Sequence, residues 1–402
     1  MSIRIRAVAE QIQTETNRIR EDIVGLRRHL HQHPELSWKE FQTAERIALM
    51  LQEEGLSVNR EVCGTGLVAD LEGVADGKTI AIRADMDALP IHDDKDVPYA
   101  SRVAGAMHAC GHDCHMSMAV GVAKVLKSLR GFPGRVRFIF QPSEEAVPSG
   151  ACEMVKAGVM DGVDGVLAFH VDPEIPAGKI GLRSGVLTAH CSEFNLSLFG
   201  KGGHAARPHQ AVDTVYLSAR ILSALYDIVG ERSQPFVPAV LTVGKISGGT
   251  KSNIIPEVVE ISGSIRTVDE QSYEEITARI EEKVRALTRS AGGRYKLHFP
   301  SPVPSVVNDS GVIHRVKEIV TAVWSQDRIV DIRNVSMGGE DFSWYLTKAP
   351  GALIRLGARK DSGEITYLHT NNFDIDERAL PLGVTLMTML VLEYLKGHKS
   401  FL

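Results

Sequence analysis

Apolar positions in the first half of the chain alternate between helical spacing and short continuous runs. Residues 38–54 repeat apolar side chains at helical spacing and end at Gly55, which predicts a helix. A second helical pattern lies within residues 115–131. Short β-rich runs that end in polar residues occupy positions 79–84, 135–140 and 166–169. Strands that alternate with helices are typical of an α/β fold with a largely parallel sheet.

From about Cys191 the pattern changes. Predicted strands at 193–199, 239–246, 258–267 and 295–299 and predicted helices at 211–229 and 270–291 follow in the order β-α-β-β-α-β. This order indicates a ferredoxin-like unit. After the proline-rich residues 299–305, helices and strands alternate again. We therefore expect an α+β domain over residues 191–300, inserted into a larger domain formed by residues 1–190 and 301–402.

Composition narrows the class of protein. The chain has 402 residues, a net charge of −5 and no strong basic field, so we expect neither a nucleic acid nor a membrane as partner. Five scattered cysteines are too few for a disulfide scaffold. The charged start lacks the apolar core of a signal peptide. The apolar run 379–392 is shorter than the roughly 20 residues of a membrane span, so it predicts a buried helix. A soluble cytoplasmic protein is the expectation.

Groups suited to catalysis or metal binding follow each of the three predicted strands in the first half. Asp85 and Asp87 follow the first strand, Glu144 and Glu145 the second, and His170 ends the third. The carboxyl ends of parallel strands collect functional groups. Adjacent carboxylates repel unless a cation or proton compensates them, so one glutamate is expected to bind metal and the other to act as a base. A solvated acidic turn, and for the aspartates a turn cap, are the plainer alternatives.

The densest cluster is at residues 108–115, which contain three histidines, two cysteines and an aspartate. Cys110 and His112 place a thiolate and an imidazole close together, and both suit zinc or another borderline transition metal. Asp113 is placed to orient an imidazole. His170 and the distant His369 are candidates for the remaining ligands of two metal ions. A polar loop and a cysteine nucleophile beside a histidine are the alternatives.

A series of motifs in order along the chain resembles the aminoacylase-type metallopeptidase family. Within it, the similarity is to the amidohydrolase branch of hippurate hydrolases, N-acyl-amino-acid amidohydrolases and auxin-conjugate hydrolases. The motifs lie at residues 31–36 (HQHPEL), 83–90 (RADMDALP), 108–115 (HACGHDCH), 141–145 (QPSEE), 202–205 (GGHA), 252–256 (SNIIP), 337–342 (MGGEDF) and 368–370 (LHT).

This resemblance implies a two-metal, aminopeptidase-like catalytic domain interrupted by a ferredoxin-like lid, through which two chains form a homodimer. It implies two divalent metal ions per subunit, of zinc, manganese, nickel or cobalt. The implied ligands are Cys110, His112, Glu145, His170 and His369. Glu144 is the implied general base.

The sequence departs from the wider family at one motif, because Asp85-x-Asp87 replaces the usual His-x-Asp. Asp87 then falls at the position of the orienting carboxylate of the catalytic machinery. Asp85 replaces a histidine ligand, and we expect it, with Asp113, to support the ligands.

In the lid, His204 is implied to reach the active site of the partner subunit. Asn253 and Arg266 are implied to hold the carboxylate of the substrate, which suits the planar fork of a guanidinium. A plain turn at Gly202 and Gly203, and pairing of Arg266 with a local acid, are the alternatives.

The expected reaction is hydrolysis of N-acyl amino acids, with acetyl, benzoyl (hippurate-like) or other aromatic acyl groups, to a carboxylic acid and a free amino acid. A dedicated N-acetyl-diaminopimelate-type deacetylase would share the motifs. A metal-free cysteine hydrolase and a catalytically silent dimeric binding protein are the remaining alternatives.

Overall fold

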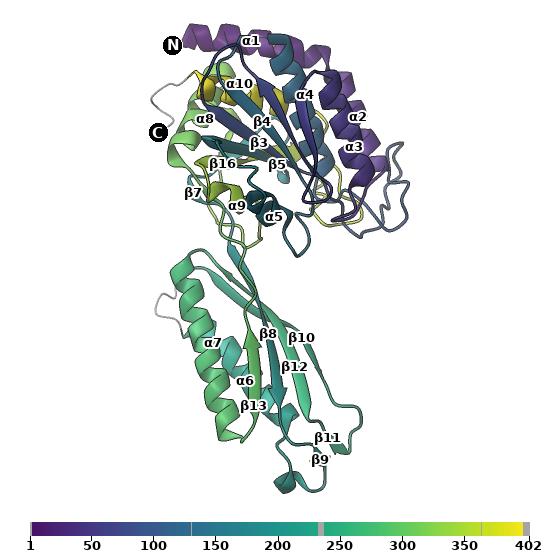
Figure 1. Cartoon of the computed structure of the whole chain (residues 1–402), viewed down its shortest axis with the longest axis vertical. Coiled ribbons are helices and arrows are strands. Elements are labelled where there is room, and N and C mark those ends of the chain that lie inside the picture. The colour runs from purple at the N-terminus through teal and green to yellow at the C-terminus, as the bar shows by residue number, and fades with distance from the viewer. Residues whose placement is uncertain (1, 130, 232–236, 363, 397–402) are drawn as a thin grey trace. The chain divides into compact units, whose positions relative to one another are not determined.

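The computed structural model describes residues 2–129, 131–231, 237–362 and 364–396 (Figure 1). The described residues form two compact units. The larger is formed by Met1–Gly185, Val307–Arg333 and Asp341–Leu402, and the smaller by Val186–Val306 with Asn334–Glu340. Positions 397–402, at the end of the last expected segment, lie outside the described residues.

An eight-stranded sheet in the order β1-β2-β4-β3-β5-β16-β6-β15 forms the centre of the larger unit. Its central strands β4, β3, β5 and β16 are parallel, whereas β1 and β2 join antiparallel at one side. The strands are β1 Ser57–Val62, β2 Gly66–Glu72, β3 Thr79–Asp85, β4 Arg135–Gln141, β5 Gly165–Pro176, β6 Ile180–Leu182, β15 Ile329–Asp331 and β16 Gly351–Arg359. The short strands β7 Gly185–Val186 and β14 Val307–Asn308 form a separate pair.

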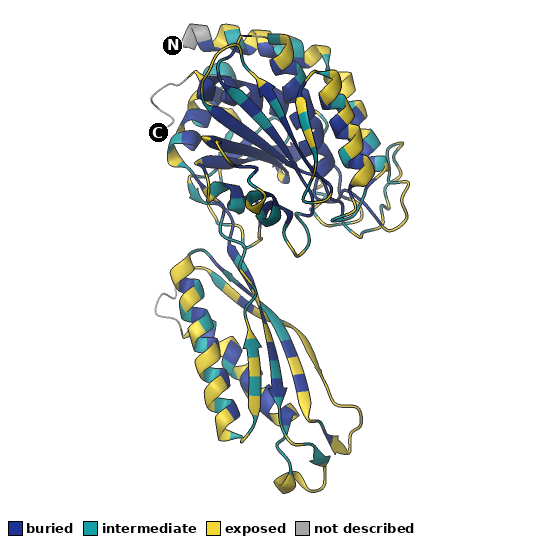
Figure 2. Cartoon of the chain, in the orientation of Figure 1, coloured by how far each residue is buried: buried dark blue, intermediate teal, exposed yellow. Residues whose placement is uncertain are grey.

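Helices cover this sheet, and their burial follows their sequence pattern (Figure 2). Within the larger unit they are α1 Ser2–Arg18, α2 Arg20–Gln32, α3 Phe41–Glu53, α4 His112–Leu129, α5 Gly150–Lys156, α8 Ser310–Val323, α9 Ser343–Leu346 and α10 Ala379–Leu395, with the short 3₁₀ turn η2 Gln326–Arg328. Most residues of α4 and α10 are buried, as the apolar run at 379–392 predicted. Every residue of β3 is buried, which fits a strand covered on both faces.

The smaller unit is an antiparallel sheet in the order β10-β12-β8-β13, with two helices. Its elements are β8 His190–Phe199, β9 Gly203–His204, η1 Pro208–Gln210, α6 Thr214–Gly230, β10 Ala239–Gly248, β11 Ile254–Ile255, β12 Val258–Thr267, α7 Glu270–Ser290 and β13 Arg294–His298. Asp213 and Asp269 cap the two helices by accepting backbone N–H bonds. This is a ferredoxin-like arrangement with its own apolar core between helices and sheet.

Among the described residues, none of the helices combines the length and the apolar character that crossing a membrane requires.

Candidate metal centre

Strands β3 and β4 bring the two acidic motifs to the same edge of the sheet. The strands are parallel, and Asp85 is paired with Gln141, so the segments that follow both strands leave together. Asp87 accepts hydrogen bonds from the backbone N–H groups of Glu144 (3.1 Å) and Glu145 (3.0 Å). The expected meeting of the acidic residues at strand ends is therefore present.

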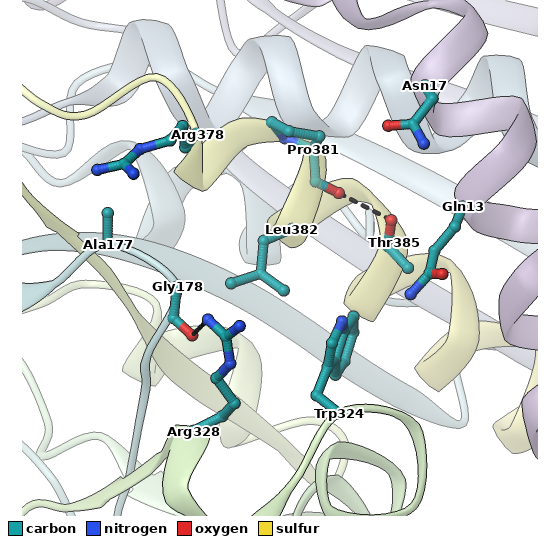
Figure 3. A pocket seen from close by; sticks show the side chains of 10 residues that line it. All are labelled: Gln13, Asn17, Ala177, Gly178, Trp324, Arg328, Arg378, Pro381, Leu382 and Thr385. Atoms are coloured by element: carbon teal, nitrogen blue, oxygen red, sulfur yellow. Dashed lines mark hydrogen bonds between the residues drawn. The ribbon is translucent and has the colours of Figure 1, made fainter.

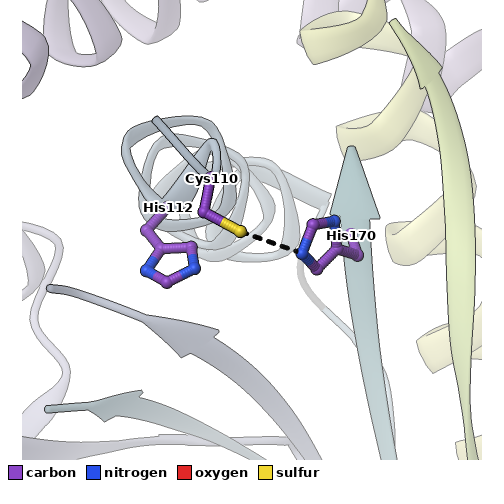
Figure 4. Close-up of side chains that lie close together, drawn as sticks. All are labelled: Cys110, His112 and His170. Atoms are coloured by element: carbon purple, nitrogen blue, oxygen red, sulfur yellow. Dashed lines mark hydrogen bonds between the residues drawn. The ribbon is translucent and has the colours of Figure 1, made fainter. Parts of the chain in front are cut away.

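His170 does not end its strand, contrary to the sequence prediction, because β5 continues to Pro176. Pairing with β3 stops at Ala168, whereas pairing with β16 continues past His170. The side of β5 that faced β3 is thus open at His170, and the chain around Cys110 and His112 lies there (Figure 4).

A glycine fixes the turn that carries Cys110 and His112. Gly111 has a φ of +85°, in the left-handed region, and a Cβ atom there would lie 2.3 Å from the Val171 side chain. Helix α4 starts at the next residue. A side chain at position 111 would therefore push this turn away from β5.

Cys110 lies between two groups of donor atoms. Its Sγ is 3.5 Å from Nε2 of His170 and 3.4 Å from Nε2 of His369. The same His369 nitrogen is 3.0 Å from Oε1 of Glu145. Five groups of three donor residues occur among the described residues, and within each group the donor atoms lie within 4.8 Å of one another. Three of them consist of expected ligands and Glu144: Cys110, His112 and His170; Cys110, Glu145 and His369; His112, Glu144 and Glu145. The other two are Asp85, His112 and His115, and Glu144, Glu340 and Asp341. The structure thus brings together every residue that the resemblance implied as a metal ligand, with Glu144 beside them.

The tautomers of two histidines suit a cation. Nδ1 of His112 faces only acceptors, the Asp87 carbonyl at 2.9 Å and its carboxylate at 3.2 Å, so Nδ1 carries the proton. Nδ1 of His170 likewise faces the Val171 carbonyl at 2.8 Å. Nε2 of His170 is left with a lone pair 3.5 Å from Cys110 Sγ. Nε2 of His112 is buried without a hydrogen-bond partner among the described residues, 3.6 Å from Asp85 and 4.0 Å from Glu145. Burial would lower the pKa of His112, but Asp85 and Cys110 raise it well above its usual value, so a bound cation would replace a proton on Nε2. Thiolate, imidazole and carboxylate donors with oriented imidazoles fit a transition-metal ion.

Burial favours the uncharged forms of His170 and Cys110, and so shifts their pKa values in opposite directions. Burial, with a contribution from Arg355, lowers the pKa of His170 well below its usual value, so the ring is neutral. Burial and the nearby Glu145 raise the pKa of the Cys110 thiol well above its usual value. Without a cation the thiol keeps its proton, whereas a bound metal ion would stabilise the thiolate.

Asp87 holds the parts of the site together through four hydrogen bonds. Besides the two backbone N–H groups, it accepts bonds from His112 and from the Ser37 hydroxyl (2.7 Å). Burial alone would raise the pKa of Asp87, but the bonds from His112 and the backbone lower it below its usual value. With both oxygens engaged, this carboxylate is placed to act through His112 and the Glu144–Glu145 turn.

Asp85 lies beside His112, with its Oδ2 3.6 Å from Nε2 of that ring. It accepts hydrogen bonds from Nδ1 of His115 (2.6 Å) and from Arg83 (2.5 Å). His115 in turn accepts the backbone N–H of Val171 (3.0 Å), so both of its ring nitrogens are engaged. Arg83 also reaches Asp341 at 2.8 Å. Sequence reasoning overlooked the supporting roles of Arg83 and His115, although they lie in the motifs at residues 83–90 and 108–115.

Asp113 supports the turn from behind, not through a metal-ligand imidazole. Its carboxylate is 2.9 Å from Nε of Arg27 and 2.7 Å from Nδ1 of His31. All three side chains are buried. His31, the first histidine of the 31–36 motif, therefore belongs to a charged network behind the Cys110–His112 turn, which sequence reasoning did not foresee.

Two residues carry strained backbone near these donors. Ser143 and His369 have φ angles of 48° and 60°, which are uncommon for residues with a side chain. His369 is held there by a hydrogen bond from its N–H to the Ala109 carbonyl (2.8 Å). Such conformations are concentrated at functional sites.

In the smaller unit, His204 and Asn253 lie together and exposed. His204 pairs with Ile254 across β9 and β11, next to Asn253. Its Nδ1 accepts the backbone N–H of Ala206 (3.1 Å), so in the neutral ring Nε2 carries the proton and is available as a donor.

Arg266 lies on β12 of the four-stranded sheet, at the end away from the separate β9–β11 pair that carries His204. Its Nη1 donates to Cys191 Sγ (3.1 Å) and to the Met337 carbonyl (2.9 Å), and the described residues give it no carboxylate partner. Residue 266 pairs with Cys191, and β8 runs eight residues further, about 26 Å at the usual rise, before Phe199 leads toward His204. The expectation that Arg266 and Asn253 hold one carboxylate therefore fails within a single chain, because a rigid sheet separates them.

Comparison with known proteins agrees with these features. The chain matches the model of peptidase family M20/M25/M40 over residues 81–393 and belongs to this family. It is 41% identical, over 74% of this chain and 81% of the relative, to an N-acyl-L-amino acid amidohydrolase of Geobacillus stearothermophilus. It is 37% identical, over 90% of this chain and 85% of the relative, to an N-acetyl-L-cysteine deacetylase of Bacillus subtilis.

A solved structure extends the comparison to the fold. The YXEP protein of Bacillus subtilis, described as a dinuclear metal-binding peptidase of the M20 family, matches with a TM-score of 0.83 and 32% identity, over 95% of this chain and all of that one. The expected family and fold class are thereby confirmed, and the chain is an enzyme of the hydrolase class.

Proposed function

We propose that the enzyme hydrolyses the amide bond of N-acyl amino acids with two divalent metal ions. The proposed ligands are Cys110, His112, Glu145, His170 and His369. The observation that carries the proposal is the position of Cys110 Sγ, within 3.5 Å of donor nitrogens from two different groups. A single thiolate between two donor groups suits a pair of ions better than a single ion.

Glu144 and Asp87 have separate roles in the proposed reaction. Bound divalent ions supply Lewis acidity to the amide carbonyl and lower the pKa of a water. Glu144 takes the proton of that water and delivers it to the amine, which would otherwise leave as an unstable anion. Asp87 holds the backbone of Glu144 and the ring of His112 during these transfers.

The smaller unit supplies the groups that bind substrate. Nε2–H of His204 is suited to donate to the oxyanion that forms on the carbonyl oxygen. Nη1 of Arg266 is already engaged, so Nε and Nη2 remain to bind a carboxylate by two hydrogen bonds. Since the length of β8 and β12 separates Arg266 from the β9–β11 pair that carries His204, we propose a homodimer in which His204 and Asn253 act on the partner chain's substrate.

The identity of the two matched relatives supports the substrate class. One is named for N-acyl-L-amino acids and the other for N-acetyl-L-cysteine, so acetyl groups are the first acyl groups to test. Benzoyl and indoleacetyl amino acids and N-acetyl-diaminopimelate are the alternatives. Thiolate and imidazole donors favour zinc, cobalt or nickel over manganese as the metal.

The test compares Glu144→Gln with wild type on a panel of N-acetyl, N-benzoyl and indoleacetyl amino acids. Loss of a general base costs about 100–10,000-fold in turnover, with the metal content unchanged. Glu174→Gln, an exposed glutamate of the same unit, is the control and should retain full activity. Normal turnover by metal-loaded Glu144→Gln would contradict the assignment. A covalent acyl adduct on Cys110 would instead establish the cysteine-hydrolase alternative.

A further inference from the structure

A hollow in the larger unit has no residue in common with the candidate metal centre (Figure 3). Its volume is about 340 Å³, which lies within the range of about 300–1,000 Å³ that is usual for small-molecule sites. Four segments far apart in sequence line it: α1, the turn between β5 and β6, the connection from α8 to η2, and the start of α10.

One side of the hollow carries a cation without a counter-ion. Nη1 of Arg328 donates to the Gly178 carbonyl at 3.0 Å, and the described residues give the guanidinium no carboxylate partner. Gly178 has a φ of +86°, and a Cβ atom there would lie 2.5 Å from that nitrogen, so the turn accepts Arg328 because residue 178 is a glycine. The neighbouring Asp327 pairs with Lys179 at 3.4 Å. Arg328 is therefore held in place by the bond from Nη1, and its other N–H groups can donate to a ligand.

The second arginine of the lining is already neutralised. Arg378 pairs with Asp361 at 2.5 Å and also with Asp376. Of the two arginines in the lining, only Arg328 has no carboxylate partner among the described residues. A ligand with one carboxylate would give the Arg328 guanidinium the partner that it lacks.

The other side of the hollow offers neutral hydrogen-bonding groups. The side-chain amides of Gln13 and Asn17 and the indole N–H of Trp324 have no hydrogen-bond partner among the described residues, and all three line the hollow. Pro381 and Leu382 provide an apolar wall between this side and Arg328 (Figure 3). A cation, an apolar surface and amide groups therefore follow one another across the hollow.

We propose that this hollow binds a small monocarboxylate that also carries an amide and an apolar group. The carboxylate would bind Arg328, the apolar group would pack on Leu382, and the amide would bond to Gln13 or Asn17. An N-acyl amino acid has all three parts, and this choice of ligand rests on the proposed function. Each chain would then bind the ligand at two separate places.

Calorimetric titration of metal-loaded Glu144→Gln enzyme with N-acetyl-L-phenylalanine tests the proposal. We expect two equivalents per chain in Glu144→Gln, and one when Arg328→Gln is added, because losing a charge-assisted hydrogen bond weakens binding about tenfold or more. Asn17→Trp, which fills the hollow from an exposed helix position, should also leave one. Arg333→Gln, a nearby exposed arginine outside the lining, should leave two. The neutral N-acetyl-L-phenylalaninamide should not bind in the hollow.

Each outcome is decisive. If Glu144→Gln binds one equivalent and Arg328→Gln does not change it, the hollow is not a site. If Arg328→Gln removes the single equivalent, the hollow binds and the proposed active site does not, so the two proposals fail separately. Two equivalents in both proteins, or no binding at all, would also overturn the proposal.

Discussion

At the scale of single residues, Asp87 shows how one buried carboxylate can connect several segments of a site. Its four hydrogen bonds join the end of β3, the His112 ring, the Glu144–Glu145 backbone and Ser37. Asp87→Asn replaces one acceptor oxygen by an NH₂ group, which would face an N–H donor. Losses of supporting groups of this kind cost about 10–100-fold in metal affinity or activity.

We therefore expect Asp87→Asn to bind metal more weakly and to turn over more slowly, in parallel. Metal titration followed by an activity assay at saturating metal measures both. Ser37→Ala, which removes a single neutral donor to the same carboxylate, is the matched control and should have a smaller effect. A normal metal affinity in Asp87→Asn would show that Asp87 does not orient His112.

If Arg266 binds the substrate as proposed, Cys191 is a second residue that acts through a neighbour. Its sulfur accepts a hydrogen bond from Nη1 of Arg266, and burial raises the pKa of its thiol. Cys191→Ala would remove one of the two acceptors that hold the guanidinium. A hydrogen bond is worth about 0.5–1.5 kcal/mol, so KM should rise about 2- to 10-fold while kcat changes little.

Steady-state kinetics of Cys191→Ala and of the control Cys152→Ala, a half-buried thiol of α5, test this prediction. The control should leave KM unchanged. A fall in kcat at constant KM would mean that Cys191 does not position a group that binds the substrate in its ground state.

At the scale of secondary-structure elements, a buried charged network connects α2, α4 and the segment before α10. Arg27 on α2 contacts Asp113 at 2.9 Å and Asp374 at 3.2 Å. Burial would raise the pKa of Asp113 and Asp374, but Arg27 lowers both below the usual 3.8, with further help from His31 and Lys360. Because their folded-state pKa values are depressed, these carboxylates stabilise the fold above about pH 4.

This stabilisation should be lost as the pH falls below about 4, toward the folded-state pKa values. Asp374→Asn should cost about 3 kcal/mol at pH 6, since it leaves a buried cation short of a partner, and the difference from wild type should shrink near pH 3. Urea unfolding at both pH values measures this. Asp361→Asn, an exposed partner of Arg378, should have little effect at either pH. A constant difference between Asp374→Asn and wild type would contradict the prediction.

Helices and strands in which apolar residues recur at a clear period were predictable from the sequence. The strand at 258–267 coincides with β12 Val258–Thr267, and the helix at 270–291 is α7 Glu270–Ser290. The long extension of β5 was not predictable, because Asp172 and Pro173 within it oppose strand formation and the pairing with β16 outweighs them. Helices α1 and α2 were overlooked, since their many charged residues conceal narrow apolar stripes.

The residues of the candidate site were predictable from the sequence, but the hydrogen bonds and ion pairs that hold them in place were not. Cysteine, histidine and paired glutamates are rare enough in such spacing to indicate chemistry on their own. The roles of Arg83, His115 and Arg27 depend on partners far away in sequence, such as Asp341 and Asp374. No local pattern marks such pairs, because burial and topology create them.

At the scale of the whole molecule, the proposed reaction needs two residues of the smaller unit that a single chain keeps apart. The strands between Arg266 and His204 keep the two residues apart within the unit, whereas the proposed reaction needs both at one substrate. A two-fold homodimer satisfies the condition if each chain donates His204 and Asn253 to its partner. Each active site would then be shared between two chains.

A shared site predicts that two inactive chains restore activity when they are mixed. Glu144→Gln lacks the base, and His204→Ala lacks the oxyanion donor, so each homodimer should be inactive. A mixed dimer contains one site with both residues intact, and random exchange of subunits should restore about a quarter of wild-type activity. Mixing Glu144→Gln with Asp87→Asn is the control and should give no activity beyond that of the two parents, because the larger unit of every chain then carries a defect that the partner's smaller unit does not replace. If exchange is verified by mass and the first mixture stays inactive, His204 serves its own chain or no site at all.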